Sequence, residues 1–182
     1  MVMSGGWRTL LPVLAAGALL AGCGGASEQQ TVDWANGLCS SYAGFREVAV
    51  VGPATATDLP TQTHNLSTYL GDTAAALDKA LTDLDHLGSS PVSGGDEAVT
   101  EFRDRLGSYR TAFTQAKSQV DALNVKAPGL ADQLRAAIAP VLALEGTTQD
   151  PLAGLDPAVT DAAGKAPACQ NLGRPGAGTP GG

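Results

Sequence analysis

Apolar residues recur at alternating intervals of three and four through one long segment of this 182-residue chain. They span three heptads and are Val99, Phe102, Leu106, Tyr109, Phe113, Ala116, Val120 and Leu123. On an α-helix this spacing places every member on one face, as in the a and d positions of a coiled coil. Neighbouring helices that cross at a shallow angle bury such a seam. The segment therefore predicts one long helix of an antiparallel bundle.

Three further segments show helical spacing of apolar residues, and clusters of Pro, Gly, Ser and Thr separate them. They cover about residues 32–50, 63–87 and 129–144. Asp156 followed by Pro157 is typical of the N-cap and first turn of a short fifth helix, which leads toward Cys169. The expected fold is all-α, an antiparallel four-helix bundle over residues 31–172 with a short C-terminal helical extension.

Two local patterns bear on where these helices begin and bend. Ser93 and Asp96 stand three residues apart and resemble a capping box, which predicts the start of the third helix. Pro140 lies inside the fourth helical segment and has no backbone N–H to donate. The fourth helix should therefore kink or weaken at this point.

The N-terminus combines one cation, Arg8, with an apolar run over residues 10–20. That run has about 11 residues, whereas a helix needs roughly 20 to cross the hydrocarbon core of a bilayer. The pattern is typical of a signal peptide covering residues 1–22. A first transmembrane helix is less favoured, because glycines follow the run without a cationic cluster.

Residues 20–23 read LAGC, and this end of the apolar run resembles the lipobox of bacterial lipoproteins. The resemblance implies that the Cys23 thiol receives a diacylglyceryl group, and that a peptidase then cuts before Cys23. Two acyl chains are enough for stable anchoring. The alternative is an ordinary secretory signal that is cut elsewhere and leaves Cys23 as a free thiol.

Two other cysteines remain once Cys23 is assigned to the lipid, namely Cys39 and Cys169. An exported chain lies in a compartment that permits disulfides, so we expect these two to pair. The bridge would close a loop of about 130 residues. The competing interpretation, catalytic or metal-binding thiols, lacks a CxxC motif or an adjacent histidine.

The two ends of the mature chain are poor in apolar residues. Residues 23–30 suit a lipidated cysteine with a flexible tether, and residues 173–182 (GRPGAGTPGG) suit a disordered tail. The net charge of the whole chain is −7. An acidic chain repels phosphate backbones and anionic headgroups, so we expect no nucleic-acid partner and membrane contact through the lipid.

The sequence offers no clear catalytic or metal-binding pattern. His64 and His86 are 22 residues apart on one predicted helix, roughly 33 Å, which is too far to share a metal ion. No GxSxG motif surrounds a serine, and the glycine-rich stretches lie in the tether and tail. We therefore expect neither an enzyme nor a cofactor or metal site.

Six of the seven aromatic residues that follow the signal segment fall on two predicted helices. They are Trp34, Tyr42, Phe45, Phe102, Tyr109 and Phe113. One hypothesis is that they line a cavity for an apolar ligand such as a lipid or a porphyrin. The alternative is that they form the core between helices rich in Ala and Leu.

Beyond the lipobox, the chain resembles the small Ala- and Gly-rich helical lipoproteins of high-GC Gram-positive (actinobacterial) envelopes. This resemblance rests on composition, on a Trp and then a Cys in the first helix, and on a late Cys. It implies a lipid-anchored protein on the extracytoplasmic face of the cell membrane. We expect a binding or structural module, with an envelope protein as a candidate partner. The alternatives are a carrier of a hydrophobic ligand and an envelope hydrolase.

Overall fold

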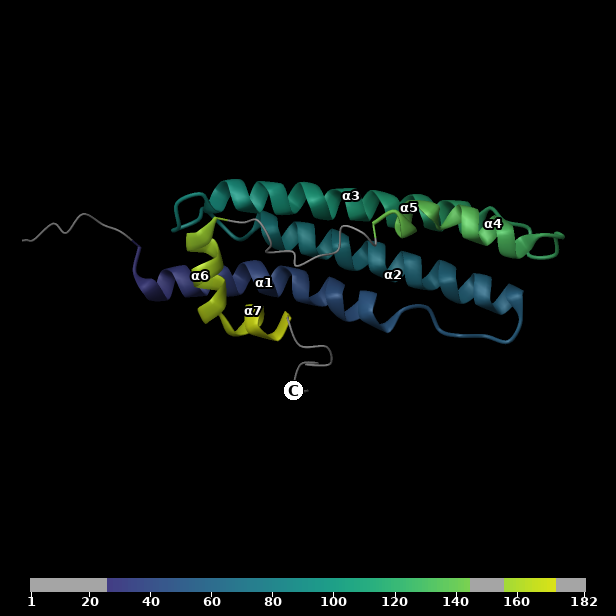
Figure 1. The fold of residues 1–182 in the computed structure, drawn as a ribbon, viewed down its shortest axis with the longest axis horizontal. Helices are drawn as coiled ribbons and strands as arrows, with labels where there is room; N and C mark the ends of the chain where they lie inside the picture. The colour runs from purple at the N-terminus through teal and green to yellow at the C-terminus, as the bar shows by residue number, and fades with distance from the viewer. Residues whose placement is uncertain (1–25, 145–155, 173–182) are drawn as a thin grey trace, which may run out of the picture.

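The computed structural model describes residues 26–144 and 156–172, and every regular element in these two ranges is a helix. Three helices are long: α1 (Glu28–Val51), α2 (Leu59–Asp85) and α3 (Gly95–Asp121). Four are short: α4 (Leu130–Ala137), α5 (Ala139–Leu142), α6 (Pro157–Lys165) and α7 (Pro167–Leu172). The predicted all-α, disulfide-linked helical bundle is confirmed (Figure 1).

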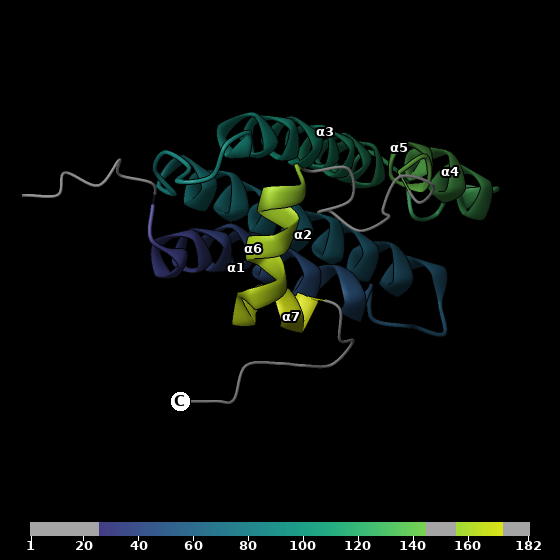
Figure 2. The same cartoon turned by 60° about the vertical axis from the view of Figure 1, so that its left-hand side comes forward.

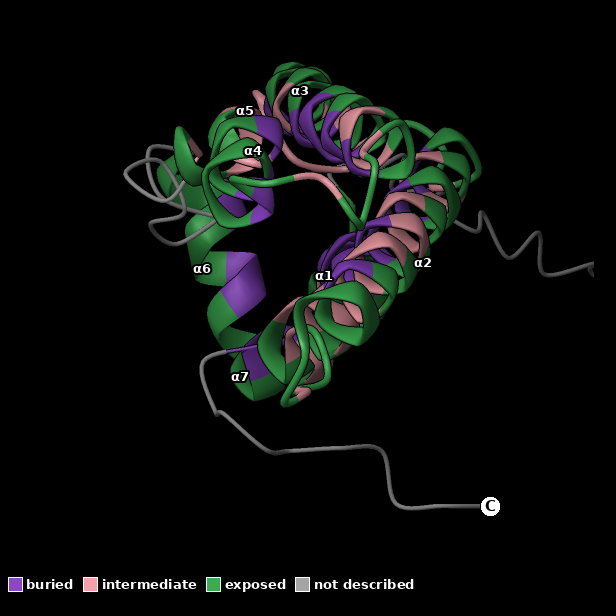
Figure 3. Cartoon of the chain, turned by 90° about the vertical axis from the view of Figure 1, so that its right-hand side faces the viewer, coloured by how far each residue is buried: buried purple, intermediate pink, exposed green. Residues whose placement is uncertain are grey.

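The three long helices run antiparallel in sequence order, and α2 packs closely against both α1 and α3 (Figure 1). At one end of the bundle, α4 and α5 turn back along α3. Near the other end, α6 crosses the long helices steeply and α7 follows on α1 (Figure 2). A view along the helices shows that their buried residues face a shared interior (Figure 3).

The fourth predicted helix, residues 129–144, is divided into α4 and α5 at Ile138. Pro140 stands in the first turn of α5, where a missing N–H costs no helical hydrogen bond. The predicted weakening at Pro140 is therefore confirmed. The C-terminal extension begins at the Asp156 N-cap as predicted, and it forms two short helices.

The first two helices begin earlier than their apolar patterns predict. Ser27 and Gln30 form a reciprocal capping box, so α1 starts at Glu28. The last three residues of the predicted flexible tether are therefore helical. Asp58 caps α2 through the Thr61 N–H, which also lowers the pKa of the Asp58 carboxyl.

The start of α3 differs from the predicted capping box. Its N-cap is Gly94, which adopts a left-handed conformation with φ of 75° and makes no side-chain cap. Asp96 instead accepts a hydrogen bond from the Ser90 N–H at 2.7 Å. Because this bond ties the preceding turn to the helix, the carboxylate stabilises the connection between α2 and α3.

The register of α2 against α3 can be read from facing pairs whose residue numbers add to a constant. Asp85 contacts Arg103 at 2.5 Å, and Asp78 contacts Arg110 at 2.7 Å. Ser67 is hydrogen-bonded to Asp121 in the same register. Exposed pairs of this kind contribute little to stability one by one. These pairs nevertheless run alongside the apolar seam of α3, where six of the eight predicted positions are buried.

Two glycines of α3 test this packing when each is replaced by alanine. The added methyl group meets open space at Gly107 and the crowded preceding turn at Gly95. A Cβ at Gly107 has no heavy atom within 4 Å, whereas a Cβ at Gly95 would lie 1.9 Å from Ser90 Oγ. Glycine inside a helix costs about 0.5–1 kcal/mol relative to alanine. We expect Gly107→Ala to raise the free energy of unfolding by about that amount, and Gly95→Ala to lower it. Urea titrations measure both, and a stabilising Gly95→Ala would contradict the described packing.

Candidate functional site

A disulfide joins Cys39 of α1 to Cys169 of α7. The two sulfur atoms are 2.07 Å apart, the Cα atoms are 5.0 Å apart, and both residues are buried. The predicted pairing is therefore confirmed. The bond joins residues separated by 130 positions, so it fixes the end of the folded chain to its first helix.

Three polar contacts flank the disulfide along α1, two before Cys39 and one after it. Lys165 Nζ lies 2.8 Å from Glu28 Oε1, and the Ala168 N–H donates to Asn36 Oδ1 at 2.9 Å. Further along, the Arg46 guanidinium donates to the carbonyl oxygen of Leu172. The partners on α1 and on the C-terminal segment succeed one another in the same order. The segment is therefore held at four points along α1.

The first of these contacts is an exposed ion pair at the start of α1. The hydrogen bond and the charge of Lys165 lower the pKa of Glu28. The same two interactions raise the pKa of Lys165. Both groups are therefore charged at neutral pH, and their contact connects the N-terminal turn of α1 to the end of α6.

The six aromatic residues of the cavity hypothesis are all buried. The Tyr42 ring lies 5.4 Å from that of Phe102 in an edge-to-face arrangement, and Phe45 lies 6.4 Å from Tyr109. These pairs connect α1 to α3 through their rings, whereas each backbone packs closely on α2. The contacts support the alternative that these side chains form the core.

Phe113 and Trp34 lie apart from those two ring pairs. Phe113 makes an edge-to-face contact with Tyr69 of α2 at 6.3 Å, so the seventh aromatic residue joins the core from a third helix. Trp34 packs near the other end of the bundle, where its Cη2 atom lies close to Gly95. Among the six, Trp34 alone borders the surface depression described next.

A surface depression of about 760 Å³ lies between the start of α1 and the connection from α2 to α3. It is lined by Ala26, Gln30, Asp33, Trp34, Leu87, Ser89 and Pro91. The depression is wide open to solvent. Apart from Trp34, the sequence offered no sign of it, because chain folding brings the lining residues together from two distant segments.

The Trp34 indole nitrogen adds an unusual feature to this end of the bundle. Trp34 is 6% exposed, and its Nε1 is a buried donor with no hydrogen-bond partner in the part of the chain that the structure describes. Buried tryptophan N–H groups usually find an acceptor, because an unpaired one costs free energy. Trp34 therefore both lines the depression and carries the unpaired donor.

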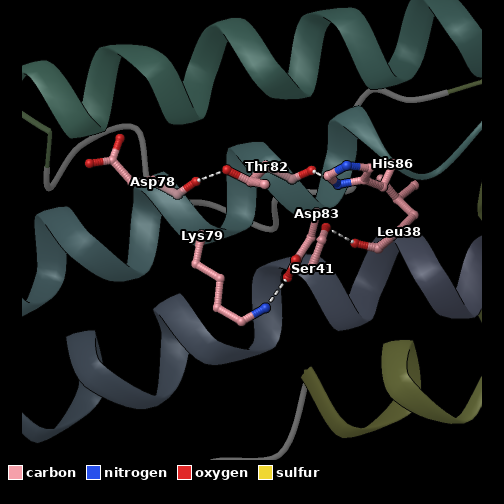
Figure 4. Close-up of polar contacts among 7 residues, drawn as sticks. All are labelled: Leu38, Ser41, Asp78, Lys79, Thr82, Asp83 and His86. Carbon is pink, nitrogen blue, oxygen red and sulfur yellow. Dashed lines mark hydrogen bonds and ion pairs between the residues drawn. The ribbon is translucent and has the colours of Figure 1, made fainter.

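The polar residues around His86 belong to helix α2 itself. The Thr82 hydroxyl donates to the Asp78 carbonyl, His86 Nδ1 lies 2.8 Å from the Thr82 carbonyl, and Lys79 pairs with Asp83 (Figure 4). His64 is exposed near the other end of α2. Within residues 26–144 and 156–172, no group of three or more His, Cys, Asp or Glu side chains is arranged to hold a metal ion.

One cluster places a serine beside a lysine, as in some hydrolases. Lys117 Nζ lies 3.4 Å from Ser67 Oγ, but it also pairs with Asp121 at 2.5 Å. Hydrogen bonds from Lys117 and Ser67 lower the pKa of the Asp121 carboxyl. The Ser67 hydroxyl donates to Asp121 and not to Lys117, so this pair lacks the nucleophile–base hydrogen bond of such enzymes. The cluster acts as a contact between α2 and α3.

The remaining predicted positions lie outside the described residues. These are Cys23 with the signal segment, and the C-terminal tail at 173–182. In the ranges that the structure covers, no helix is both long enough and apolar enough to cross a membrane. Comparison of the chain with protein-family models, curated proteins and solved structures gave no match in any of the three.

The disulfide should contribute a large share of stability, because it closes a loop of 130 residues. The chain-entropy model gives about 5 kcal/mol for a loop of that length. We expect the double variant Cys39→Ala, Cys169→Ala to lose free energy of unfolding of that order in urea titrations. Cys23→Ser, which leaves the bond intact, is the control. A loss below about 1 kcal/mol would contradict the assigned role of the bond.

The pH dependence of stability tests the contact at Asp121. The folded pKa of Asp121 lies below the unfolded value, so the stabilisation is present above the unfolded pKa. It is lost as the pH falls through the folded pKa. The carboxylate is 46% exposed, so we expect Asp121→Asn to cost less than about 1 kcal/mol at pH 7, and the cost to shrink in acid.

Urea titrations at both pH values measure this difference, with Asp72→Asn as the control. Asp72 is an exposed carboxylate on α2, so its replacement reports the effect of removing a surface charge. A cost of Asp121→Asn that grows on acidification would contradict the assignment.

Proposed function

We propose that this chain is a lipoprotein, anchored through Cys23 at the outer face of the cell membrane, whose helical domain is a binding module. The observation that carries the proposal is the division of the three cysteines. Cys39 and Cys169 are joined and buried. Cys23, at the end of the LAGC box, is left for acylation. A buried disulfide also suits an oxidising compartment outside the cytoplasm.

The start of α1 supports close anchoring. Ser27 caps this helix, and only four peptide links separate its Cα atom from that of Cys23. A fully extended chain of that length spans about 14 Å. In the proposal, the membrane-proximal end of the bundle therefore contains the first turn of α1 and the connection between α2 and α3.

We propose binding in preference to catalysis, because the polar clusters of the described residues already make structural contacts. Ser67, Lys117 and Asp121 join α2 to α3, and His86 bonds to its own helix. The depression beside Trp34 is a concave surface with both polar and apolar lining residues. A carrier with its ligand among the other five aromatic rings is less favoured, because those rings contact one another or Tyr69.

The anchor is tested by Cys23→Ser in the full chain, expressed in a bacterial host that processes lipoproteins. We expect the wild-type protein to fractionate with membranes and to carry the mass of residues 23–182 plus a diacylglyceryl group. The variant should lack this added mass, because serine offers no thiol for acylation. Fractionation in detergent and intact mass spectrometry give both readouts.

The matched control replaces the other two cysteines by serine and leaves Cys23 in place. This variant should keep the lipid, although its domain is less stable. A wild-type protein whose mass lacks the diacylglyceryl group would refute the anchor. So would a Cys23→Ser protein that still carries it.

A further inference from the structure

The three cysteines can pair in more than one way before the domain folds. Cys23 and Cys39 are 16 positions apart, whereas Cys39 and Cys169 are 130 positions apart. The entropic cost of closing a flexible loop rises with its length, so an unfolded chain brings the nearer pair together about 20 times as often. A disulfide between Cys23 and Cys39 is therefore the bond that an unfolded and unmodified chain forms first.

The direction of export favours the same nearer pair. A signal segment at the N-terminus leads the chain across the membrane, and residues 23–39 follow it directly. Cys23 and Cys39 therefore reach the oxidising compartment before Cys169 does. Helices α2, α6 and α7, which pack on α1 in the folded domain, also arrive later, so at this stage they do not cover Cys39.

The folded structure excludes a bond between Cys23 and Cys39. The Cys39 sulfur is bonded to Cys169, and both residues are buried. The C-terminal segment also contacts α1 at points from Glu28 to Arg46, on both sides of the disulfide. A tether joined to Cys39 would have to run along this same part of α1. Cys23 and Cys169 therefore compete for one sulfur atom and for one strip of the helix.

The length of the tether shows when this competition ends. Helix α1 rises about 18 Å between its N-cap, Ser27, and Cys39. Four peptide links from Cys23 to Ser27 span about 14 Å when fully extended. Once α1 is formed from its first turn, Cys23 thus comes within bonding distance of Cys39 only on a fully stretched tether. Mispairing therefore belongs to the stage before α1 and α7 have folded together.

Acylation removes the competing thiol. The Cys23 sulfur bonds to a glyceryl carbon of a phospholipid, the bond from that carbon to the phosphate oxygen breaks, and the thiol proton leaves with the released headgroup phosphate. The product is a thioether, which has no S–H group. Disulfide formation and exchange both require a thiolate, so an acylated Cys23 cannot join Cys39. Cys169 is then the one partner left.

We propose that acylation of Cys23 precedes oxidation of Cys39, and that the lipid thereby directs the disulfide as well as anchoring the domain. This inference rests on the proposed lipid anchor and adds an order of reactions to it. Transfer of the diacylglyceryl group from a phospholipid comes first. A thiol oxidase outside the cytoplasm then takes two electrons and two protons from Cys39 and Cys169, and its own disulfide is reduced to two thiols.

The experiment uses full chains exported by a bacterial host that processes lipoproteins. The double variant Leu20→Asp, Gly22→Asp disrupts the LAGC box and keeps Cys23 as a thiol, which intact mass verifies. The matched control carries the same two changes together with Cys23→Ser, so it has the same leader and no competing thiol. Free thiols are trapped with iodoacetamide soon after synthesis and again at steady state.

Disulfide mapping separates the possible pairs. A protease that cuts before aspartate cleaves at Asp33 and Asp161, so each cysteine falls on its own peptide. In early samples of the double variant we expect the Cys23–Cys39 pair to exceed the Cys39–Cys169 pair about 20-fold, with Cys169 alkylated. The matched control and the wild-type chain should contain Cys39–Cys169 alone, because neither has a thiol at position 23 when Cys39 is oxidised.

The outcomes separate the order of reactions from the anchor. Equal early fractions of Cys39–Cys169 in the double variant and the matched control would overturn the competition. Early wild-type molecules that contain this bond while Cys23 is still unacylated would overturn the order and leave the anchor intact. A wild-type chain that never gains a diacylglyceryl group would refute the anchor, and the double variant would still test the competition against its control.

Discussion

The Cys39–Cys169 bond holds the C-terminal segment against α1, and the arrangement of the end of the bundle around the start of α1 follows from it. Because α7 is tied to α1, α6 is placed across the long helices next to the connection between α2 and α3. A Cβ at Gly94 in that connection would lie 3.1 Å from Asp156, the N-cap of α6. The connection in turn borders Trp34 and the depression. A covalent bond formed far along the chain thus supports the end of the bundle that contains the depression.

The long helices are held together by two kinds of contact with different roles. Leucine and aromatic side chains fill the interior and supply most of the stabilising burial. Exposed polar pairs between α2 and α3, such as Asp78 with Arg110, keep the two helices in one register. A shift by one helical turn would separate these pairs. Each pair adds little free energy, yet all of them fit the same register and so favour one alignment over its neighbours.

Much of this architecture could be predicted from the sequence, because the strongest signals are local or covalent. The α3 seam, the break before Pro140 and the Asp156 N-cap depend on a few adjacent residues. The cysteine pairing followed from counting the thiols. The capping box at Ser27 was also visible as a serine with glutamine three residues later. The apolar pattern of α1 starts beyond this box and by itself predicts a later start for the helix.

Other features could not be predicted, because they depend on how distant segments meet. Gly94 and not Ser93 is the N-cap of α3, and Asp96 accepts from the Ser90 N–H of the preceding turn. The depression combines residues of α1 with the connection after α2, and no local pattern marks their contact. The aromatic residues were correctly placed on two helices. Their division into a packed core and a separate Trp34 could not be predicted, because it depends on ring contacts between distant helices.

The central claim is that the three cysteines divide between a structural bond and a lipid anchor. Mass spectrometry of the membrane-extracted protein under non-reducing conditions tests it most directly. We expect a chain that begins at Cys23 with a diacylglyceryl group, together with a peptide pair that links Cys39 to Cys169. A chain that retains residues 1–22, an unmodified Cys23, or free thiols at Cys39 and Cys169 would contradict it.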